Sequence, residues 1–274
     1  KAVETGREVK IHIAADTGMC RIGYVPSPEA IEEVKKIAAL PGIAMQGIFT
    51  HFSEADIADK EWAHEQHRRF SDFIDALKAV GVTFNIHHCC NSAGTLELPD
   101  FHREMIRPGI IQYGYDASKE VLVTGTKIKP VMSLRCCITH LKTIYEGDCV
   151  GYGRHFTATG PTKIATLPIG YADGYNRALS SKIDVIVHGV RAHQVGNICM
   201  DQCMIDVSHI PDVKVGDEVV LFGEQGSECV SADEIADTCH TIIHEITCNI
   251  NRRVPRIYVQ NGKIVQRLEY LTQS

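Results

Sequence analysis

The sequence lacks the features that mark membrane, nucleic-acid-binding and secreted proteins. It has no run of about 18 consecutive apolar residues, so we expect no segment that spans a membrane. It has no basic stripe and a formal net charge of −6, which argues against a nucleic-acid partner. No leader peptide opens the given residues, and we predict a cytoplasmic protein. Hydrophobic content of 44% and charged content of 23% are those of a globular chain.

A regular, even set of cysteines is also missing. The 11 cysteines are scattered and include the adjacent pairs Cys89-Cys90 and Cys136-Cys137. Such a set does not form the disulfide framework of a small secreted domain, so we expect reduced thiols. The spacing Cys199-x-x-x-Cys203 is the nearest approach to a zinc site, but no second ligand pair follows at a suitable distance. We therefore predict no bound metal.

Strands and helices alternate over the first 117 residues. Apolar runs predict four strands, at residues 9–15, 44–52, 84–90 and 104–107. Helical spacing of apolar residues predicts helices at residues 28–39 and 59–80. This order indicates a parallel sheet with helical crossovers. We predict that residues 1–117 form a partial α/β barrel, the C-terminal half of a (β/α)8 TIM-type barrel that holds its last four strands.

A polar side chain or pair follows each predicted strand at its carboxyl end. The four positions are Arg21, His51, Asn91-Ser92 and Arg107. One such residue is more often an ordinary surface group, but four from consecutive strands favour a site, because this rim of a barrel carries the chemistry. Residues 90–114 are the part of the chain most important for this hypothesis, since small residues after two strands let backbone N–H groups approach a phosphate. The simpler interpretation of the same stretch is two ordinary strand-to-helix turns without a ligand.

The pattern changes after residues 116–130, which are rich in Ser, Thr, Gly and Lys and are expected to form a linker. Short apolar runs then predict antiparallel strands at residues 131–145, 163–169, 182–190, 203–207 and 218–222. We predict that residues 118–274 form a C-terminal β domain with one helix.

That helix is expected at residues 232–249, where Ser231-x-x-Glu234 is a plausible capping box. A last strand is expected at residues 254–259, before an Asn261-Gly262 hairpin turn. Three polar motifs stand out in this domain, at residues 151–154, 170–175 and 199–202. A tyrosine between glycines either packs on a turn or acts as an acid or base, and the latter needs its pKa of about 10 lowered by a cation.

Taken together and in order, these motifs resemble the alanine racemase family, pyridoxal phosphate (PLP) enzymes of fold type III, over nearly the whole chain. The matching motifs are Asp16-Thr17-Gly18-Met19-x-Arg21, Gly47-Ile48-Phe49-Thr50-His51-Phe52, Asn91-Ser92-Ala93, Arg107-Pro108-Gly109-Ile110, Gly170-Tyr171-Ala172-Asp173-Gly174-Tyr175, Gly196-x-x-Cys199-Met200-Asp201-Gln202 and Arg253-Val254-Pro255-Arg256. The resemblance implies an isomerase that interconverts L- and D-alanine with two bases and supplies D-alanine for the peptidoglycan of the cell wall.

The resemblance also implies roles for single residues. Tyr152 is one of the two bases, and His51 links it to Arg107 and helps to lower its pKa. Arg107 faces the pyridine nitrogen of PLP and keeps it unprotonated, because a guanidinium only donates hydrogen bonds. The implied cofactor-binding residues are Arg107, Asn91, Ser92, Gly109 and Ile110, of which Ser92 and the N–H groups of Gly109 and Ile110 hold the phosphate.

The implied substrate-binding residues are Arg21, Met200, Tyr171 and Arg177. In the family, the residues matching Tyr152, Met200, Tyr171 and Arg177 reach into the active site of the neighbouring subunit. The resemblance therefore implies a homodimer with shared active sites, and a small amino acid, alanine or serine, as the substrate.

Departures from the family pattern leave alternatives open. The family's Schiff-base lysine lies in a Lys-Ala-(Asp/Asn)-Ala-Tyr-Gly segment that the given residues do not contain, and the chain starts with Lys1 rather than Met. We expect a fragment that does not catalyse by itself. Ala14, Asn197 and Arg252 replace residues common in relatives. The alternatives are the serine racemase domain of a membrane-anchored, vancomycin-resistance type protein and a non-catalytic scaffold or regulatory remnant of the fold.

Overall fold

The computed structural model describes residues 1–120 and 128–271. The chain divides into two compact units, Lys1–Lys129 and Pro130–Ser274. The linker expected at residues 116–130 lies partly outside the described residues. Among the helices of the described residues, none combines the length and the apolar character needed to cross a membrane.

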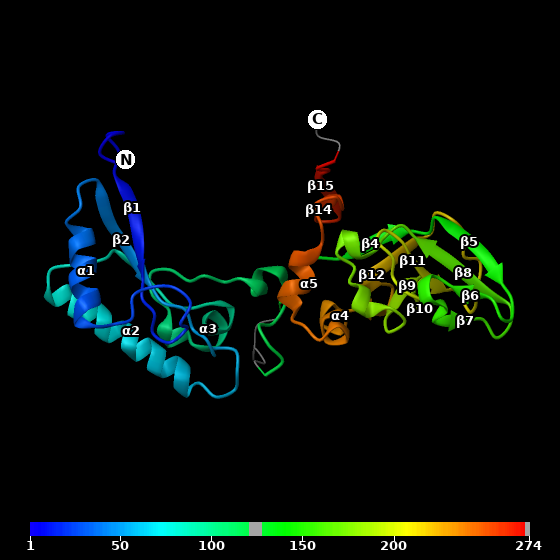
Figure 1. Ribbon diagram of the computed structural model, residues 1–274, viewed down its shortest axis with the longest axis horizontal. Coiled ribbons are helices and arrows are strands. Elements are labelled where there is room, and N and C mark those ends of the chain that lie inside the picture. Colours follow the sequence, from blue (N-terminus) through cyan, green and yellow to red (C-terminus); the bar gives the residue numbers. More distant parts are fainter. Residues whose placement is uncertain (121–127, 272–274) are drawn as a thin grey trace. The chain divides into compact units, whose positions relative to one another are not determined.

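The first unit is built on a parallel sheet with the order β1-β2-β3 (Figure 1). Its strands are β1 (Val9–Ala14), β2 (Ile43–Phe49) and β3 (Ile86–His88). Helix α1 (Pro28–Ala38) and helix α2 (Glu61–Ala79) are the two crossovers. Because the strands follow one another in space as in sequence, right-handed connections put both helices on the same face of the sheet. The carboxyl ends of the strands meet at one edge, where Ala14 pairs with Phe49 and Phe49 with His88.

The apolar faces of the two helices create the core of this unit. Ser27 caps α1 by accepting a hydrogen bond from the N–H of Ala30, at 3.2 Å. Phe70, Phe73 and Leu77 recur at helical spacing on α2 and are buried against the strands. Gly81, at φ +85°, takes the left-handed conformation that ends α2.

The fourth strand predicted at residues 104–107 is wrong. This segment has no regular secondary structure, with a bend at Glu104, and pairs with no strand among the described residues. The Glu104 side chain accepts the N–H of His87 at 2.8 Å, so it occupies a position that a ladder partner would take. Pro108 follows and has no N–H to donate. Helix α3 (Ser92–Glu97) and the short 3₁₀ helices η1 (Pro99–Phe101) and η2 (Ile110–Tyr113) complete the unit.

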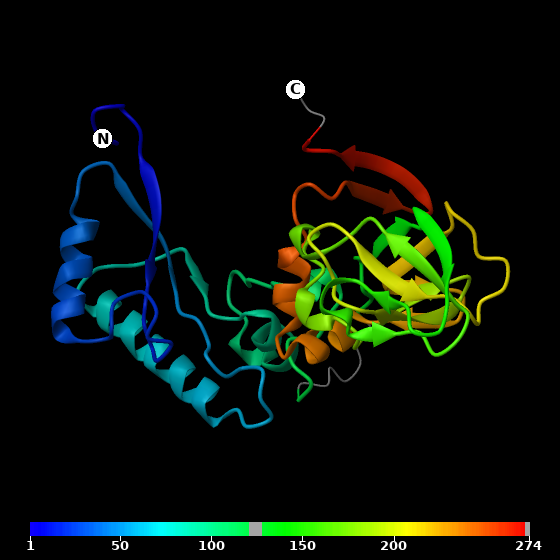
Figure 2. The same cartoon turned by 45° about the vertical axis from the view of Figure 1, so that its right-hand side comes forward.

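The second unit is built on an eight-stranded sheet in which every pairing is antiparallel (Figure 2). Its order is β13-β12-β9-β10-β11-β8-β5, with β4 paired to β12. The strands are β4 (Leu134–Cys137), β5 (His140–Ile144), β8 (Thr162–Leu167), β9 (Asp184–Val187), β10 (Val190–Val195), β11 (Cys203–Asp206), β12 (Glu218–Gln225) and β13 (Glu228–Val230). The run predicted at residues 182–190 divides between β9 and β10, because His188 and Gly189 turn the chain at positive φ.

Shorter elements carry the polar motifs of this unit. Strands β6 (Cys149–Val150) and β7 (Phe156–Thr157) flank η3 (Tyr152–Arg154). Two further 3₁₀ helices follow β8, namely η4 (Tyr171–Asp173) and η5 (Arg177–Leu179).

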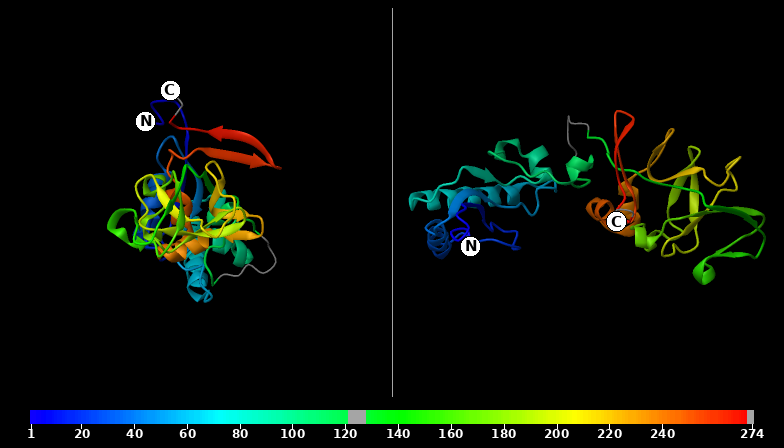
Figure 3. Two further views of the ribbon diagram at one scale, coloured as in Figure 1. Left: turned by 90° about the vertical axis from the view of Figure 1, so that its right-hand side faces the viewer. Right: turned by 90° about the horizontal axis from the view of Figure 1, so that it is seen from above.

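The single helix predicted at residues 232–249 is two helices, α4 (Ala232–Cys239) and α5 (Ile243–Asn249). His240 breaks it by taking a left-handed conformation, with φ at 55°. The hydroxyl of Ser231 accepts the N–H of Glu234 at 3.0 Å, as expected for the cap of α4. Beyond α5, β14 (Arg256–Gln260) and β15 (Lys263–Leu268) form a two-stranded ribbon of their own (Figure 3).

Candidate active site

Arg107 is the centre of a cluster at the carboxyl edge of the parallel sheet. Its backbone N–H donates to the carbonyl of Cys90 at 2.9 Å, which anchors the segment at residues 104–107 beside the end of β3. Its Nη1 donates to Nδ1 of His88, and its Nη2 donates to the carbonyl of Thr50 at 2.7 Å and to Nδ1 of His51 at 3.3 Å. The structure therefore brings Arg107 and His51 together, as predicted.

Among the described residues, the guanidinium of Arg107 has no carboxylate partner. Burial lowers its pKa, and the neighbouring thiols of Cys89 and Cys90 oppose that shift only in part. Its four acceptors are neutral and receive hydrogen bonds from Nη1 and Nη2, so within residues 1–120 and 128–271 the Nε–H has no hydrogen-bond partner. This N–H is not one of the fully buried donors that lack a partner, so it stays open to an acceptor from outside. The site is therefore suited to an electron-rich nitrogen or oxygen.

Both histidines that accept from Arg107 are held neutral. The pKa of His51 is lowered, first by burial and then by the charges of Arg107 and Arg21. Burial, followed by Arg107, lowers the pKa of His88 to about 4. A neutral ring can present a lone pair to the arginine, whereas a cationic ring has only donors. The influence of Arg21 on His51 also shows that this predicted substrate-binding residue is electrostatically part of the cluster.

The loop that carries Arg21 is shaped by local contacts. The carboxylate of Asp16 accepts the N–H groups of Gly18 and Cys20, at 3.1 and 2.9 Å. The buried hydroxyls of Thr17 and Thr50 lie 2.7 Å apart and join this loop to the end of β2. Arg21 itself is exposed, which leaves its guanidinium open to a carboxylate from solution.

The predicted phosphate-binding residues lie on two neighbouring turns. Asn91 caps α3 by accepting the N–H of Gly94 at 2.9 Å. Ser92, the first residue of that helix, accepts the N–H of Gly109 at 2.8 Å, and Ile110 begins η2 next to it. The structure therefore joins Ser92 and Gly109 directly.

The predicted residues of the second unit are exposed on adjacent turns. Tyr152 is 75% exposed, and its carbonyl accepts from the Asn197 amide at 2.8 Å. The N–H groups of Tyr171 and Ala172 donate to the carbonyls of Cys199 and Met200, at 3.1 and 2.8 Å, which joins the Tyr171 turn to the Met200 turn.

A surface hollow of about 470 Å³ is lined by two of the predicted substrate-binding residues, Tyr171 and Arg177. Asn249 of α5 completes its wall. The turn is held by an ion pair between Arg253 and Asp173, with 2.6 Å between Nε and Oδ1. This ion pair gives the matching Arg253 motif a structural role.

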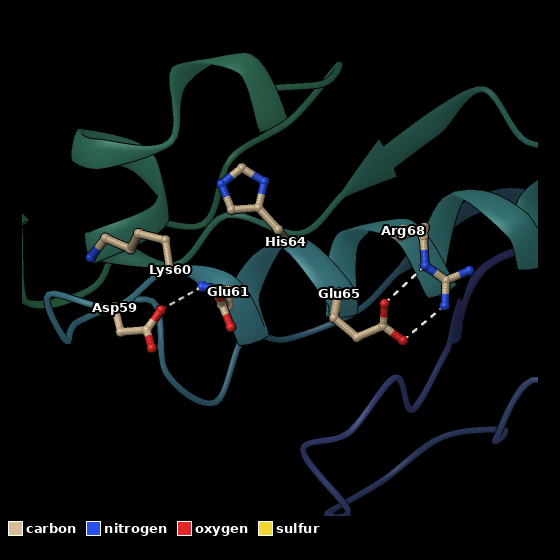
Figure 4. Close-up of a pocket in the computed structure, with 6 residues that line it drawn as sticks. All are labelled: Asp59, Lys60, Glu61, His64, Glu65 and Arg68. Carbon is tan, nitrogen blue, oxygen red and sulfur yellow. Dashed lines mark hydrogen bonds and ion pairs between the residues drawn. The ribbon is translucent and has the colours of Figure 1, made fainter.

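A larger hollow of about 520 Å³ lies along the first half of α2 and includes none of the predicted residues (Figure 4). Three of its charged groups have ion-pair partners. Glu65 pairs with Arg68 at 2.8 Å, and Lys60 pairs with Glu97 at 2.6 Å. Its two cations are thus already engaged.

Sequence reasoning missed His88 and Thr50, which complete the arrangement around Arg107. A usable signal was present, because residues 86, 88 and 90 share one face of an extended strand. His88 lies on the same face as Cys90, which directly precedes Asn91 of the predicted site, so this alternation could have identified His88. The carbonyl of Thr50 has no signature, since any residue supplies one.

Comparisons with known proteins agree with this arrangement. The pattern described as alanine racemase, N-terminal domain, matches residues 1–117, and that described as alanine racemase, C-terminal domain, matches residues 131–258. The chain is 46% identical to alanine racemase 1 of Clostridium acetobutylicum over 96% of its own length and 68% of that protein. The solved alanine racemase of Clostridium difficile 630 has a TM-score of 0.94 and 40% identity, over 98% of this chain and 70% of that one.

A second solved structure is the alanine racemase of Bacillus anthracis with bound L-Ala-P, at a TM-score of 0.92 and 36% identity, over 96% of this chain and 68% of that one. An α/β unit, a β unit and an arginine-centred cluster define the chain as an amino-acid isomerase of the two-unit racemase type. It belongs to the alanine racemase family, which is PLP-dependent. The chain spans about 70% of the length of these relatives.

Proposed function

We propose that this chain supplies the arginine, serine and tyrosine part of a PLP site that interconverts L- and D-alanine. The observation that carries the proposal is the Nε–H of Arg107, which meets no acceptor among the described residues while the other donors of the guanidinium are engaged. A non-catalytic scaffold gains nothing from a half-buried cation with a free donor. The pyridine nitrogen of PLP is an acceptor of the required kind.

The residues of the first unit fit the cofactor at both ends. Arg107 donates to the ring nitrogen and, because a guanidinium does not release its proton near neutral pH, leaves that nitrogen unprotonated. Ser92 and the N–H groups of Gly109 and Ile110 hold the phosphate, for which the Gly109 N–H exchanges the Ser92 hydroxyl for a phosphate oxygen, while Asn91 fixes the turn that presents Ser92. When bound, PLP supplies the electron-withdrawing group that makes the α-hydrogen of alanine acidic.

Tyr152 is proposed as one of the two bases at the α-carbon. A phenol removes a proton near neutral pH only if a cation or a hydrogen bond lowers its pKa, and His51 with Arg107 provides both on one copy of the chain. The exposed Tyr152, Tyr171 and Met200 are free to enter the site of a second copy. We therefore propose a homodimer with shared active sites, in which Arg21 and the N–H of Met200 bind the substrate carboxylate.

The parallel sheet β1-β2-β3 and the segment that ends at Arg107 are proposed to be part of a (β/α)8 barrel. The order of the strands and the crossovers on one face agree with such a barrel. We also propose a cytoplasmic location, in keeping with the 11 free thiols, all of which lie in the described residues.

Binding of PLP to residues 1–274 tests the cofactor site directly. Arg107→Lys should weaken binding roughly tenfold, measured by equilibrium dialysis, because an ammonium does not reproduce the planar donor geometry of a guanidinium. Arg68→Lys is the matched control, since Arg68 lies on the outer side of α2. Equal affinity for the two variants would contradict the proposal.

Catalysis is tested after the chain is joined to the lysine-bearing segment of a relative. Tyr152→Phe should abolish racemisation and should stop exchange of the α-hydrogen with solvent for one enantiomer of alanine, while the other enantiomer still exchanges through the second base. Tyr145→Phe, at an exposed tyrosine outside the predicted site, is the control. Loss of both exchange reactions in Tyr152→Phe would contradict a two-base role. Comparing kcat/KM for alanine and serine decides the substrate.

A further inference from the structure

His12 of β1 lies behind His88, on the side opposite Arg107. Its Nδ1 is 2.7 Å from Nε2 of His88, and the two ring centroids are 5.0 Å apart. Neither the family motifs nor the predicted site residues include it. His12, His88 and Arg107 therefore form a line of three polar side chains that starts on the first strand and ends at the guanidinium.

The donors and acceptors along this line have only one consistent arrangement. Arg107 has donors only, so the His88 Nδ1 that it contacts must accept. A neutral imidazole with a bare Nδ1 carries its hydrogen on Nε2, which therefore donates to Nδ1 of His12. The hydrogen of a neutral His12 must then lie on Nε2. Each link fixes the next, so an acceptor at His12 selects the tautomer of His88 that Arg107 requires.

The backbone is adapted to hold His12 in this position. The register of β1 against β2 shifts between Ile11 and His12, which is the local irregularity that re-aims a side chain in a strand. His12 then pairs with Gly47, where an added Cβ would lie 2.5 Å from Nδ1 of His12. Any other residue at position 47 would displace the ring. Gly47 belongs to a family-like motif, and its need for a bare backbone follows from His12 and from the carbonyl oxygen of Ile86, which would lie 2.8 Å from the same Cβ.

We propose that His12 is a positioning residue that fixes the tautomer of His88 and, through it, the orientation of Arg107 toward the acceptor at its Nε. The part of this inference that concerns PLP rests on the function proposed above. The part that concerns His88 and Arg107 is a property of the chain without any ligand. His88 stacks on Phe49, with a centroid distance of 5.1 Å, so the ring plane is held and only its hydrogen remains to be fixed.

Two substitutions separate the hydrogen bond from the volume of the ring. His12→Phe keeps a ring but removes the acceptor, whereas His12→Asn keeps an acceptor oxygen near the position of Nδ1. Nitrogen-15 NMR of labelled histidine reads the tautomer of His88 without PLP. We expect the wild type and His12→Asn to show His88 with its hydrogen on Nε2. In His12→Phe only Arg107 still selects this tautomer, so a measurable fraction of the other tautomer should appear. His102→Phe, at an exposed position of the same unit, is the control.

Equilibrium dialysis of PLP against the same variants gives the second measurement. His12→Phe should lose roughly tenfold in affinity, as when the partner behind a ligand-binding histidine is removed, and His12→Asn should stay within about twofold. An unchanged tautomer of His88 in His12→Phe, or a hydrogen on Nδ1 in the wild type, would overturn the inference. If the tautomers behave as expected but the wild type does not bind PLP, the proposed function fails while the positioning role stands.

Discussion

A single arginine organises the candidate site because, among the described residues, the groups that accept its hydrogen bonds carry no charge. His51, His88 and the carbonyl of Thr50 leave the guanidinium with its full positive charge. A carboxylate in any of these places would neutralise that charge and compete for the ligand. Burial keeps the ring of His88 neutral, and the neutral ring leaves the positive charge of Arg107 available for a ligand.

The low pKa of His88 predicts how the stability of the first unit depends on pH. Its folded-state value of about 4 lies below the ordinary value, so the unfolded chain binds a proton that the folded chain does not. Stability is therefore complete above the ordinary pKa and falls as the pH drops toward 4. Between about pH 7 and about pH 5, His88 should account for a loss of about 2 kcal/mol in the free energy of unfolding.

Urea unfolding measures this dependence, since the sole tryptophan, Trp62, lies on α2 of the first unit and reports on it by fluorescence. His88→Gln should reduce the pH dependence by the share of His88 and leave the share of His67, whose pKa burial also lowers to about 4. His102→Gln, at an exposed site, should leave it as in the wild type. An equal slope in wild type and His88→Gln would show that His88 titrates normally.

Removing the hydroxyl of Ser92 should cost stability as well as cofactor binding. Ser92→Ala leaves the N–H of Gly109 without its acceptor, which should lower the free energy of unfolding by about 1 to 3 kcal/mol. It also removes a hydroxyl proposed to donate a hydrogen bond to the phosphate of PLP. Chemical denaturation and PLP dialysis measure the two effects. Thr95→Val on the same helix removes a hydroxyl but orphans no amide, because the N–H of Thr95 still donates to Asn91. Equal effects of the two changes would exclude the special role of Ser92.

At the scale of elements, the turns of the second unit depend on a glycine with an ordinary backbone conformation. Gly170 has φ near −155°, yet an added Cβ would lie 2.2 Å from the carbonyl oxygen of Cys199. This close approach allows the Tyr171 and Met200 turns to join. The glycine of this motif is needed because two segments of the same chain approach each other closely there. Its φ angle does not require a glycine.

Gly170→Ala should therefore destabilise the second unit by about 1 to 3 kcal/mol and displace the turns that carry Tyr171 and Met200. Gly160→Ala is the matched control, since a Cβ there meets nothing within 4 Å. Thermal unfolding followed by circular dichroism of the two variants makes the comparison. A Gly170→Ala variant as stable as Gly160→Ala would show that the loops yield without cost.

Elements with strong local signals could be predicted from the sequence, and those decided by distant partners could not. Helices α1 and α2 follow from apolar spacing and from signals such as Ser27 and Gly81. The segment at residues 104–107 has the composition of a strand, but strand identity requires a ladder partner, and Pro108 with the Glu104 side chain prevents one. The break at His240 was equally hidden, because nothing local forbids a continuous helix there.

At the scale of the whole molecule, the sequence alone showed the family motifs and their order. It did not show the residues that hold the site residues in position. Arg107 and Ser92 were visible as polar residues after strands. His12 was not, because a histidine in an alternating strand resembles any half-buried residue. The 2.7 Å contact between its Nδ1 and Nε2 of His88 shows that it faces that ring, and the register shift in β1 and the bare backbone at Gly47 make room for it.

Covalent labelling tests the composition of the site in residues 1–274. Incubation with PLP followed by borohydride should give no stoichiometric adduct at any one lysine, because no lysine among the described residues makes a contact with Arg107, Ser92 or His51. Peptide mass spectrometry locates any label. Full labelling of one lysine that competes with alanine would contradict this assignment and would move the anchor into the given residues.

The parallel sheet of the first unit has the order β1-β2-β3, so β1 and β3 have a neighbouring strand on one side only within the described residues. Amide and carbonyl groups along such a margin pair readily with any extended peptide that reaches them. Samples of residues 1–274 should therefore form larger species as the protein concentration rises. A short peptide with the sequence of a complementary strand should convert the larger species back into smaller species. The edge of the sheet would then accept a strand supplied by a separate peptide.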